Sequence, residues 1–416
     1  MKRLAMVSAA TFLAATMTTH AHAEPPAPSP GTMIMIGGAL SDGNSEIYQE
    51  IVRRAGGPHA RIGVITAASL PPSQDPAAGT PRAANSATNG RFYVDILKRY
   101  GAGAARWLPV DLDHPGAGDD PKIAAQAASM TGFVFGGGDQ YRLVTALLHG
   151  TAHTDSRVLA AIRARFAGGA VVAGTSAGAQ IQAGPDMVTG GASYQALRDG
   201  SRAGYFDDDT LLAELPAGGF GLFSAGLIDT HFSAYGRLGR AVRLASDTGH
   251  QRVFGLDPDT ALEVTGTSLR VLGRHGVSVL DLREAVPGVR DGHWSISGVR
   301  WSYLTRGAAY DPATWTCRMP PATPRLTPAG RSAASPVQDI FGSSAAGGGG
   351  GFRLTRAALD LAGAGASTTV LGLTYETNPV FAVALAKENT FTAWGEGAAT
   401  GFTDLTVSMY PSPQQP

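Results

Sequence analysis

Short apolar segments alternate with amphipathic stretches along the first half of the chain. The apolar segments are 32–36, 61–66, 106–110, 132–135 and 171–175, and the stretches between them include 46–55, 91–100, 122–129 and 140–148. A continuous apolar run of this length is typical of a strand that is buried on both faces of a sheet. The alternation therefore predicts an α/β fold in which right-handed crossover helices flank a mostly parallel, doubly wound sheet.

The second half changes character. After another short apolar segment at 226–229, three segments (253–256, 261–264 and 269–272) are joined by tight turns, and they are expected to extend or flank the sheet in antiparallel fashion. Residues 323–351 are rich in Pro, Ser, Ala and Gly and end in five consecutive glycines, which predicts a linker or long loop. Residues 352–416 regain alternating apolar positions, which predicts a β-rich extension that either forms a small module or returns strands to the main body.

The N-terminus has the features of an export signal. Lys2 and Arg3 precede an apolar stretch, and Ala21-His22-Ala23 matches a signal-peptidase site. We therefore expect a signal peptide over 1–23, a main domain over 24–322 and a periplasmic or secreted product. No other apolar run approaches the ~18 to 20 residues needed to cross a bilayer, so no membrane association is expected after the signal is removed.

Composition narrows the ligand classes. Cys317 is the single cysteine, so the chain has no Cys cluster for zinc or iron–sulfur binding. Neither a metal nor an organic cofactor is expected. The 33 basic residues balance the 33 acidic ones, without a basic block interleaved with aromatics, which gives no support for a nucleic-acid partner. The oligomeric state stays open, with a homodimer among the alternatives.

A Gly-x-Ser-x-Gly turn follows the segment 171–175. Gly174-Thr175-Ser176-Ala177-Gly178 leads from a predicted buried strand into a predicted helix, as in a nucleophile elbow. A serine hydroxyl needs such a turn, and a neighbouring base, to become a nucleophile. Ser176 is the candidate nucleophile; the alternative is an ordinary strand-to-helix turn with an N-cap serine.

The candidate base is His231, in Asp229-Thr230-His231-Phe232-Ser233 at another predicted strand end. Imidazole can accept the hydroxyl proton near neutral pH and return it to the leaving group, although a lone histidine is more often structural. Asp229 either orients a neighbouring side chain or ends the strand.

Two further features bear on the chemistry. The backbone amides of Gly138, Asp139 and Ala177 are candidates for an oxyanion hole, while a phosphate cradle is disfavoured because the glycine run lacks the nucleotide-binding spacings. Arg237, Arg240 and Arg243 recur every three residues on a predicted helix, where they either clamp substrate carboxylates or form a solvated face, the second being preferred for Arg243.

Four motifs together resemble the cyanophycinase family of serine exopeptidases, which are related to the aspartyl dipeptidases. They are 136–140, 174–178 with Ala179, 229–233 with 236–240, and Gly255-Leu256-Asp257-Pro258-Asp259-Thr260-Ala261. The resemblance spans residues 32 to about 275, and the segment after Thr323 has no assigned counterpart. It implies a class-I-glutamine-amidotransferase-like fold, Ser176 as nucleophile and His231 as base.

The resemblance also implies the substrate and its contacts. It implies cleavage of cyanophycin, a poly-aspartate backbone with arginine on each side chain, to the dipeptide β-Asp-Arg, with Gln140, Arg237 and Arg240 as substrate contacts. Gln195 stands where the family usually has a glutamate that orients the imidazole, and an amide stabilises imidazolium less. Tyr235 stands where an arginine is usual.

Three hypotheses follow from these observations. The first is an exported serine peptidase that acts on a peptide or cyanophycin-like polymer. The second is an esterase or amidase of α/β-hydrolase type, which also uses Gly-x-Ser-x-Gly with the serine before the histidine. The third, motivated by Gln195 and Tyr235, is a secreted binding protein of the same fold that has lost turnover.

Overall fold

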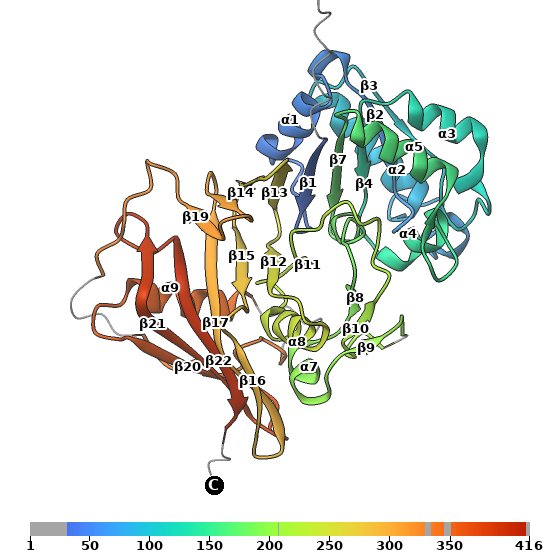
Figure 1. The fold of residues 1–416 in the computed structure, drawn as a ribbon. Helices are drawn as coiled ribbons and strands as arrows, with labels where there is room; N and C mark the ends of the chain where they lie inside the picture. The colour runs from blue at the N-terminus through green and yellow to red at the C-terminus, as the bar shows by residue number, and fades with distance from the viewer. Residues whose placement is uncertain (1–30, 207, 329–333, 345–350, 413–416) are drawn as a thin grey trace, which may run out of the picture.

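The computed structural model describes residues 31–206, 208–328, 334–344 and 351–412, and it is built around two large sheets (Figure 1). The first has nine strands in the order β19-β18-β14-β13-β1-β7-β4-β2-β3. Its parallel part consists of β1 (Thr32–Ile36), β2 (Arg61–Ile65), β3 (Ala104–Trp107), β4 (Gly132–Phe135) and β7 (Val171–Thr175). Its antiparallel part consists of β13 (Thr260–Thr265), β14 (Ser268–Gly273), β18 (Ala309–Asp311) and β19 (Thr316–Arg318). The predicted α/β fold with a mostly parallel sheet is confirmed.

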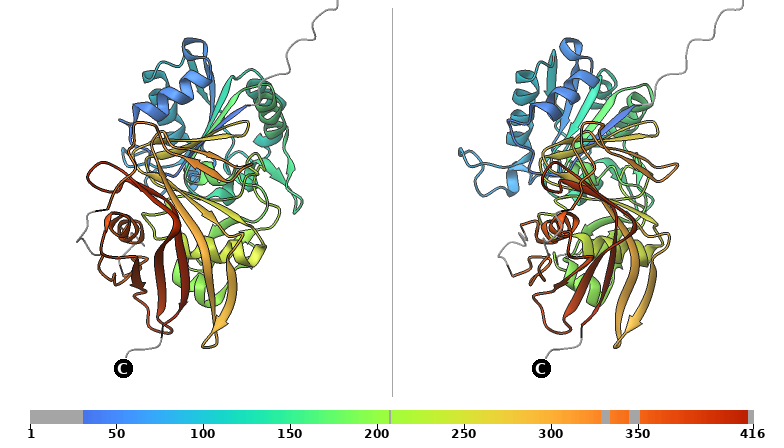
Figure 2. Two further views of the ribbon diagram at one scale, coloured as in Figure 1. Left: turned by 60° about the vertical axis from the view of Figure 1, so that its left-hand side comes forward. Right: turned by 90° about the vertical axis from the view of Figure 1, so that its left-hand side faces the viewer.

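Helices cover both faces of the parallel part, as the turned views of Figure 2 show. They are α1 (Ser45–Arg54), α2 (Ser86–Arg99), α3 (Pro121–Ala128), α4 (Gln140–Leu147) and α5 (Arg157–Ala167). Successive residues of a strand point to opposite faces. In β1, Ile34 and Ile36 join the core under α1 and α2, whereas Met33 and Met35 join the core under α3, α4 and α5. The central strands β1, β4 and β7 are predominantly apolar, as expected when both faces of a sheet are buried.

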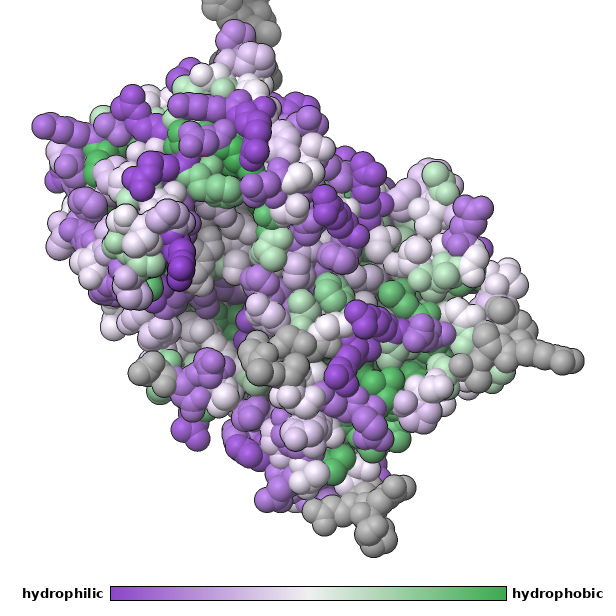
Figure 3. All heavy atoms as spheres, turned by 180° about the vertical axis from the view of Figure 1, so that it is seen from behind, coloured by the Kyte–Doolittle hydropathy of each residue, from purple (hydrophilic) through white to green (hydrophobic). Residues whose placement is uncertain are grey.

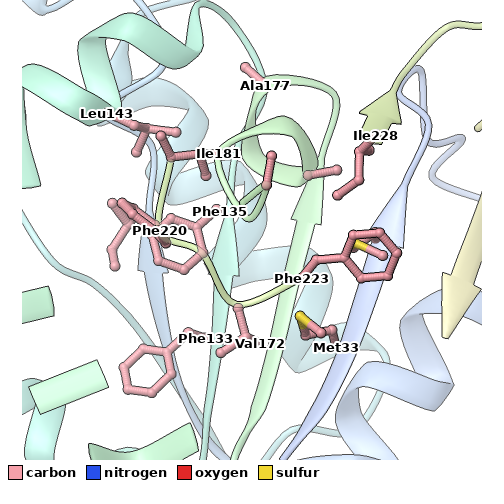
Figure 4. Packing of buried hydrophobic residues seen from close by; sticks show 14 of the residues in the cluster. Met33, Phe133, Phe135, Leu143, Val172, Ala177, Ile181, Phe220, Phe223 and Ile228 are labelled. Carbon is pink, nitrogen blue, oxygen red and sulfur yellow. The ribbon is translucent and has the colours of Figure 1, made fainter. Parts of the chain in front are cut away.

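Figure 4 shows the second of these cores, in which Phe133, Phe135 and Val172 of neighbouring strands pack against Leu143 and Phe220. Removing one such aromatic ring typically costs roughly 3 to 5 kcal/mol of stability. This core also contains Ala177, directly after the candidate nucleophile. The elbow is therefore supported by a buried hydrophobic core.

The second sheet has eight strands in the order β11-β12-β15-β17-β22-β21-β20, with β16 paired to β17. The strands are β11 (Leu227–Asp229), β12 (Arg252–Leu256), β15 (Gly276–Asp281), β16 (Val286–Arg290), β17 (His293–Thr305), β20 (Thr369–Leu373), β21 (Phe381–Trp394) and β22 (Gly401–Pro411). Since β22 pairs with β17, the segment after 352 continues a sheet that the main body begins. This segment also contributes a helix, α9 (Arg353–Gly363).

The position of β12 differs from the sequence-based expectation. β13 and β14 extend the first sheet in antiparallel fashion, as predicted, but β12 lies in the second sheet between parallel β11 and antiparallel β15. The chain crosses from one sheet to the other in the three residues between β12 and β13. The turn that looked like an ordinary hairpin is therefore the place where the two sheets meet.

Shorter elements complete the chain. They are α6 (Ala177–Gln180), α7 (Ser193–Asp199), α8 (Leu238–Thr248), the 3-10 turns η1 (Gly57–His59), η2 (Pro72–Gln74) and η3 (Ala117–Asp119), and the strands β5 (Leu148–His149), β6 (Thr154–Asp155), β8 (Met187–Gly190), β9 (Arg202–Ala203) and β10 (Ala213–Leu215). Hydrophilic residues cover much of the face in Figure 3, with hydrophobic ones in small groups between them. Within the described residues, no helix has both the length and the hydrophobicity of a membrane span. The expected signal peptide lies outside the described residues.

Candidate active site

Ser176 occupies a sharp turn between β7 and α6. Its φ is +52° and its ψ is −119°, a conformation that non-glycine residues rarely adopt and that is typical of a nucleophile elbow. Both flanking glycines are needed, because a Cβ on Gly174 would lie 1.9 Å from the carbonyl oxygen of Gly178, and one on Gly178 would lie 2.2 Å from that of Phe135. The Ser176 N–H donates to the carbonyl of Ile36 at 2.9 Å, which ties the elbow to the end of β1.

His231 lies two residues after the end of β11 and reaches the serine from the second sheet. Its Nε2 lies 2.9 Å from the Oγ of Ser176. With Nε2 as the acceptor, the ring proton is on Nδ1. The His231 N–H donates to the carbonyl of Gly37 at 2.7 Å, and a Cβ on Gly38 would lie 2.2 Å from Nε2. The Gly37-Gly38 pair at the end of β1 therefore makes room for the base.

The electrostatic environment keeps His231 neutral. Burial lowers its pKa to about 4, with the positive charges of Arg237 and Arg240 acting in the same direction and Asp229 opposing them. At neutral pH the imidazole is therefore unprotonated and able to accept a proton. Its ring also stacks on Tyr235, with centroids 5.0 Å apart and an interplanar angle of 11°.

A buried ion pair lies behind the histidine. Arg240 donates to both carboxylate oxygens of Asp229, at 2.7 and 2.6 Å, and its Nη1 donates to the carbonyl of Gly191 at 2.7 Å. Burial alone would raise the pKa of Asp229, but the charges of Arg240 and Arg237 outweigh it and hold that pKa below its usual value. All three guanidinium nitrogens of Arg240 therefore donate hydrogen bonds to these protein acceptors. Arg240 stabilises the structure behind His231.

Arg237 is less constrained. Only its Nη1 is bonded among the described residues, to the carbonyl of Thr230 at 2.7 Å and to Asp229 at 3.4 Å. Arg237 also lines the cavity in front of Ser176. Arg243 pairs with Asp247 at 2.8 Å and does not line this cavity, in keeping with the solvated role preferred for it.

The predicted oxyanion donors are not equivalent. The N–H of Asp139 donates to the carbonyl of Ala68 at 2.8 Å, which removes it from the predicted set. The N–H groups of Gly138 and Ala177 have no acceptor among the described residues, and both residues line the cavity. Gly138 has a φ of +139°, and a Cβ there would lie 2.1 Å from the Ala68 oxygen, so only glycine fits this loop. The available donors are therefore Gly138 and Ala177.

A cavity of about 760 Å³ opens in front of the Ser176–His231 pair. Gln140 lines it and donates from Nε2 to the carbonyl of Val188 at 2.9 Å. Gln195 also lines it, but no hydrogen bond joins Gln195 to His231 in the described structure, and its Oε1 is buried without a donor. The structure therefore does not bring Gln195 into the role of imidazole partner. In the described part of the chain, no group of three or more His, Cys, Asp or Glu side chains could hold a metal ion.

Asp257 has a role that sequence reasoning missed. The motif 255–261 carries only a family resemblance in the sequence, but in the structure Asp257 accepts the N–H of Ser233 at 2.8 Å and the hydroxyl of Tyr303 at 2.7 Å. Burial raises the pKa of Asp257. These bonds hold the turn after His231 against the second sheet. The Asp257-Pro258-Asp259 triplet was the available signal, since buried carboxylates in a turn usually cap neighbouring backbone.

Comparison with known proteins adds the family. A cyanophycinase of Synechococcus elongatus is 32% identical to this chain over 271 residues, which cover 64% of this chain and 72% of the relative. This chain belongs to the cyanophycinase family. Another cyanophycinase, of Trichormus variabilis, is 29% identical over 255 residues, covering 61% of this family member and 74% of the relative.

No protein-family model matches this cyanophycinase-family chain. Among solved structures, a peptidase from an acI-B1 Actinobacterium is similar, with a TM-score of 0.46 and 17% identity over 68% of this chain and 98% of its own.

Proposed function

We propose that this chain is an exported serine exopeptidase of cyanophycinase type, which hydrolyses cyanophycin or β-aspartyl peptides and releases β-Asp-Arg. The observation that carries the proposal is the 2.9 Å contact between Ser176 Oγ and His231 Nε2. The two residues come from different sheets, and both have the positive φ that points to a constrained site. Membership of the cyanophycinase family supplies the substrate class.

In the proposed acylation step, Ser176 Oγ attacks the scissile carbonyl carbon while its proton passes to Nε2 of His231. The tetrahedral oxyanion accepts hydrogen bonds from the N–H groups of Gly138 and Ala177, each typically worth roughly 3 to 4 kcal/mol of transition-state stabilisation. Collapse breaks the C–N bond, and His231 returns the proton to the leaving amine. A water molecule then attacks the acyl-enzyme with His231 again as base, which regenerates Ser176 and releases the acid.

His231 works in this scheme without a hydrogen-bonded carboxylate. The described residues offer no partner to its Nδ1, and the nearby carboxylate of Asp229 is committed to Arg240. Stacking on Tyr235 and the backbone bond to Gly37 orient the ring instead. The free side of Arg237 is placed to receive a carboxylate of the substrate, as guanidinium groups commonly do.

One observation favours the alternative of a binding protein with little or no turnover: Gln195 is not hydrogen-bonded to His231. Labelling with a fluorophosphonate separates the two functions, because only an activated serine reacts quickly. We expect rapid labelling of the wild-type protein at Ser176 and none in Ser176→Ala, with loss of dipeptide release from cyanophycin. Ser343→Ala is the matched control, since Ser343 lines the same cavity and should leave labelling intact. Slow labelling of the wild type would leave the binding role.

A further inference from the structure

The segment after residue 323 contributes to the cavity in front of Ser176. Ser343 and Glu376 both line it, and Glu376 lies in the loop between β20 and β21. This loop is anchored at two points: Thr374 Oγ1 donates to the Glu376 carbonyl at 3.1 Å, and the Tyr194 hydroxyl donates to the carbonyl of Asn378 at 2.5 Å. Tyr194 belongs to α7, so the loop is held against the main body.

Two oxygen acceptors in this cavity have no donor. The Oε2 of Glu376 and the Oε1 of Gln195 are both buried and make no hydrogen bond in the described structure. A buried acceptor left unpaired typically costs about 1 to 3 kcal/mol, and more when it is charged, so such atoms usually have a partner in the functional state. The missing partner must carry several N–H or O–H groups if it is to satisfy both.

The charges around the cavity are divided. Arg237 lies near His231, and Arg240 is neutralised by Asp229. Glu376 forms no ion pair in the described structure, and the exposed Asp208 and Asp209 line the same cavity. A ligand with a carboxylate at one end and a cation at the other matches this division. A guanidinium is the cation that offers five N–H donors in a planar arrangement, enough for a carboxylate and an amide oxygen together.

We propose that Glu376 is a specificity-determining residue that binds the guanidinium of the substrate's arginine, with Gln195 Oε1 as a second acceptor. This inference rests on the proposed function and deepens it. Gln195 then belongs to substrate recognition, which is consistent with the lack of a bond to His231. The C-terminal segment supplies the selectivity, whereas the first sheet supplies the nucleophile.

The test compares Glu376→Gln with the parent protein on a dimer of linked units, (β-Asp-Arg)₂, and on (β-Asp-Leu)₂, which has the same scissile bond between the two aspartates without a cation. We expect kcat/KM for (β-Asp-Arg)₂ to fall by about 10- to 100-fold, the usual range for a charge-assisted hydrogen bond, and the value for (β-Asp-Leu)₂ to change by less than about threefold. Glu396→Gln is the matched control, since Glu396 is exposed in the same segment and does not line the cavity. Equal losses on both substrates, or no loss, would overturn the inference.

Binding to the Ser176→Ala protein provides a readout that does not depend on turnover. Calorimetry with the two dimers should show that adding Glu376→Gln weakens the binding of (β-Asp-Arg)₂ alone, by a similar factor. Selective binding that depends on Glu376, without hydrolysis by the wild type, would contradict the proposed peptidase function and keep this inference. Hydrolysis with unchanged preference in Glu376→Gln would contradict this inference and keep the peptidase function. A protein that binds neither dimer would refute the assignment of Glu376.

Discussion

The two halves of the candidate active site are built in different ways. On the nucleophile side, a few consecutive residues between β7 and α6 impose the geometry, because the close approaches at Gly174 and Gly178 are to main-chain atoms. On the base side, His231 is placed by contacts from distant parts of the chain, including Gly37 and the buried Asp229–Arg240 pair. The comparison teaches that the serine is positioned by local backbone and the histidine by tertiary structure.

The largest effect is expected where the two sides touch. In Gly38→Ala, the new Cβ would lie 2.2 Å from His231 Nε2, at a backbone φ of +103° that alanine rarely adopts. Displacing the base should lower kcat/KM by roughly 10²- to 10⁴-fold, the usual contribution of general-base catalysis. Gly57→Ala is the control, since Gly57 also has a positive φ of +59° but nothing lies near its Cβ position. Similar activities of the two variants would show that Gly38 does not make room for the base.

The next effect concerns the ion pair behind the base. Asp229→Asn leaves the buried charge of Arg240 without its partner, which typically costs roughly 3 to 5 kcal/mol of stability. Urea unfolding followed by circular dichroism measures this loss. Asp199→Asn is the matched change in an exposed pair with Arg198, where no more than about 1 kcal/mol is expected. Equal destabilisation by both variants would mean that the buried pair has no special role on the base side.

A smaller effect is expected at Tyr235. Its stacking on His231 orients the imidazole, and an aromatic contact of this kind is worth about 0.5 to 1.5 kcal/mol. Tyr235→Ala should therefore lower kcat by roughly two- to tenfold, with little change in KM, whereas Tyr235→Phe should keep the wild-type value. A rise in KM alone would assign Tyr235 to substrate binding instead.

The smallest predicted change is in the pH profile. Burial lowers the pKa of His231 to about 4, so kcat/KM should stay level from pH 7 to about pH 5 and fall below that as the imidazole gains a proton. Arg237→Gln removes a positive charge that contributes to this shift, so the acidic limb should move to higher pH. Arg243→Gln is the control, because Arg243 pairs with Asp247 and is absent from the causes of the shift. An unmoved limb in Arg237→Gln would show that the charge of Arg237 does not contribute to the lowered pKa of His231.

The same pKa makes a prediction about stability. In the unfolded chain His231 has its ordinary pKa of 6.5, so between pH 6.5 and 4 the unfolded state binds more protons than the folded state. The contribution of this group to the free energy of unfolding therefore falls as the pH drops through that window. Urea titrations at pH 7 and pH 4.5 should show a smaller decrease in His231→Gln than in the wild type.

What could be predicted from the sequence follows the same division. The buried strands, the elbow at Ser176 and the strand-end position of His231 are encoded locally, by apolar runs and glycine spacing. The assignment of β12 to a second sheet, the use of the Asp139 amide by Ala68 and the cavity position of Glu376 depend on pairings between segments far apart in the chain. No local pattern encodes these pairings, because each depends on how the two sheets meet.

The pairing of β22 with β17 has a consequence for the stage of synthesis at which the cavity in front of Ser176 can be completed. The sheet that ends in β11, just before His231, is completed by β20, β21 and β22, which all begin more than 130 residues after the histidine. The wall of the cavity that contains Glu376 lies in the loop between β20 and β21, so it is completed only after these strands have been made. If Glu376 binds arginine as proposed, the selectivity of the site is the last of its parts to be synthesised, after the nucleophile and the base.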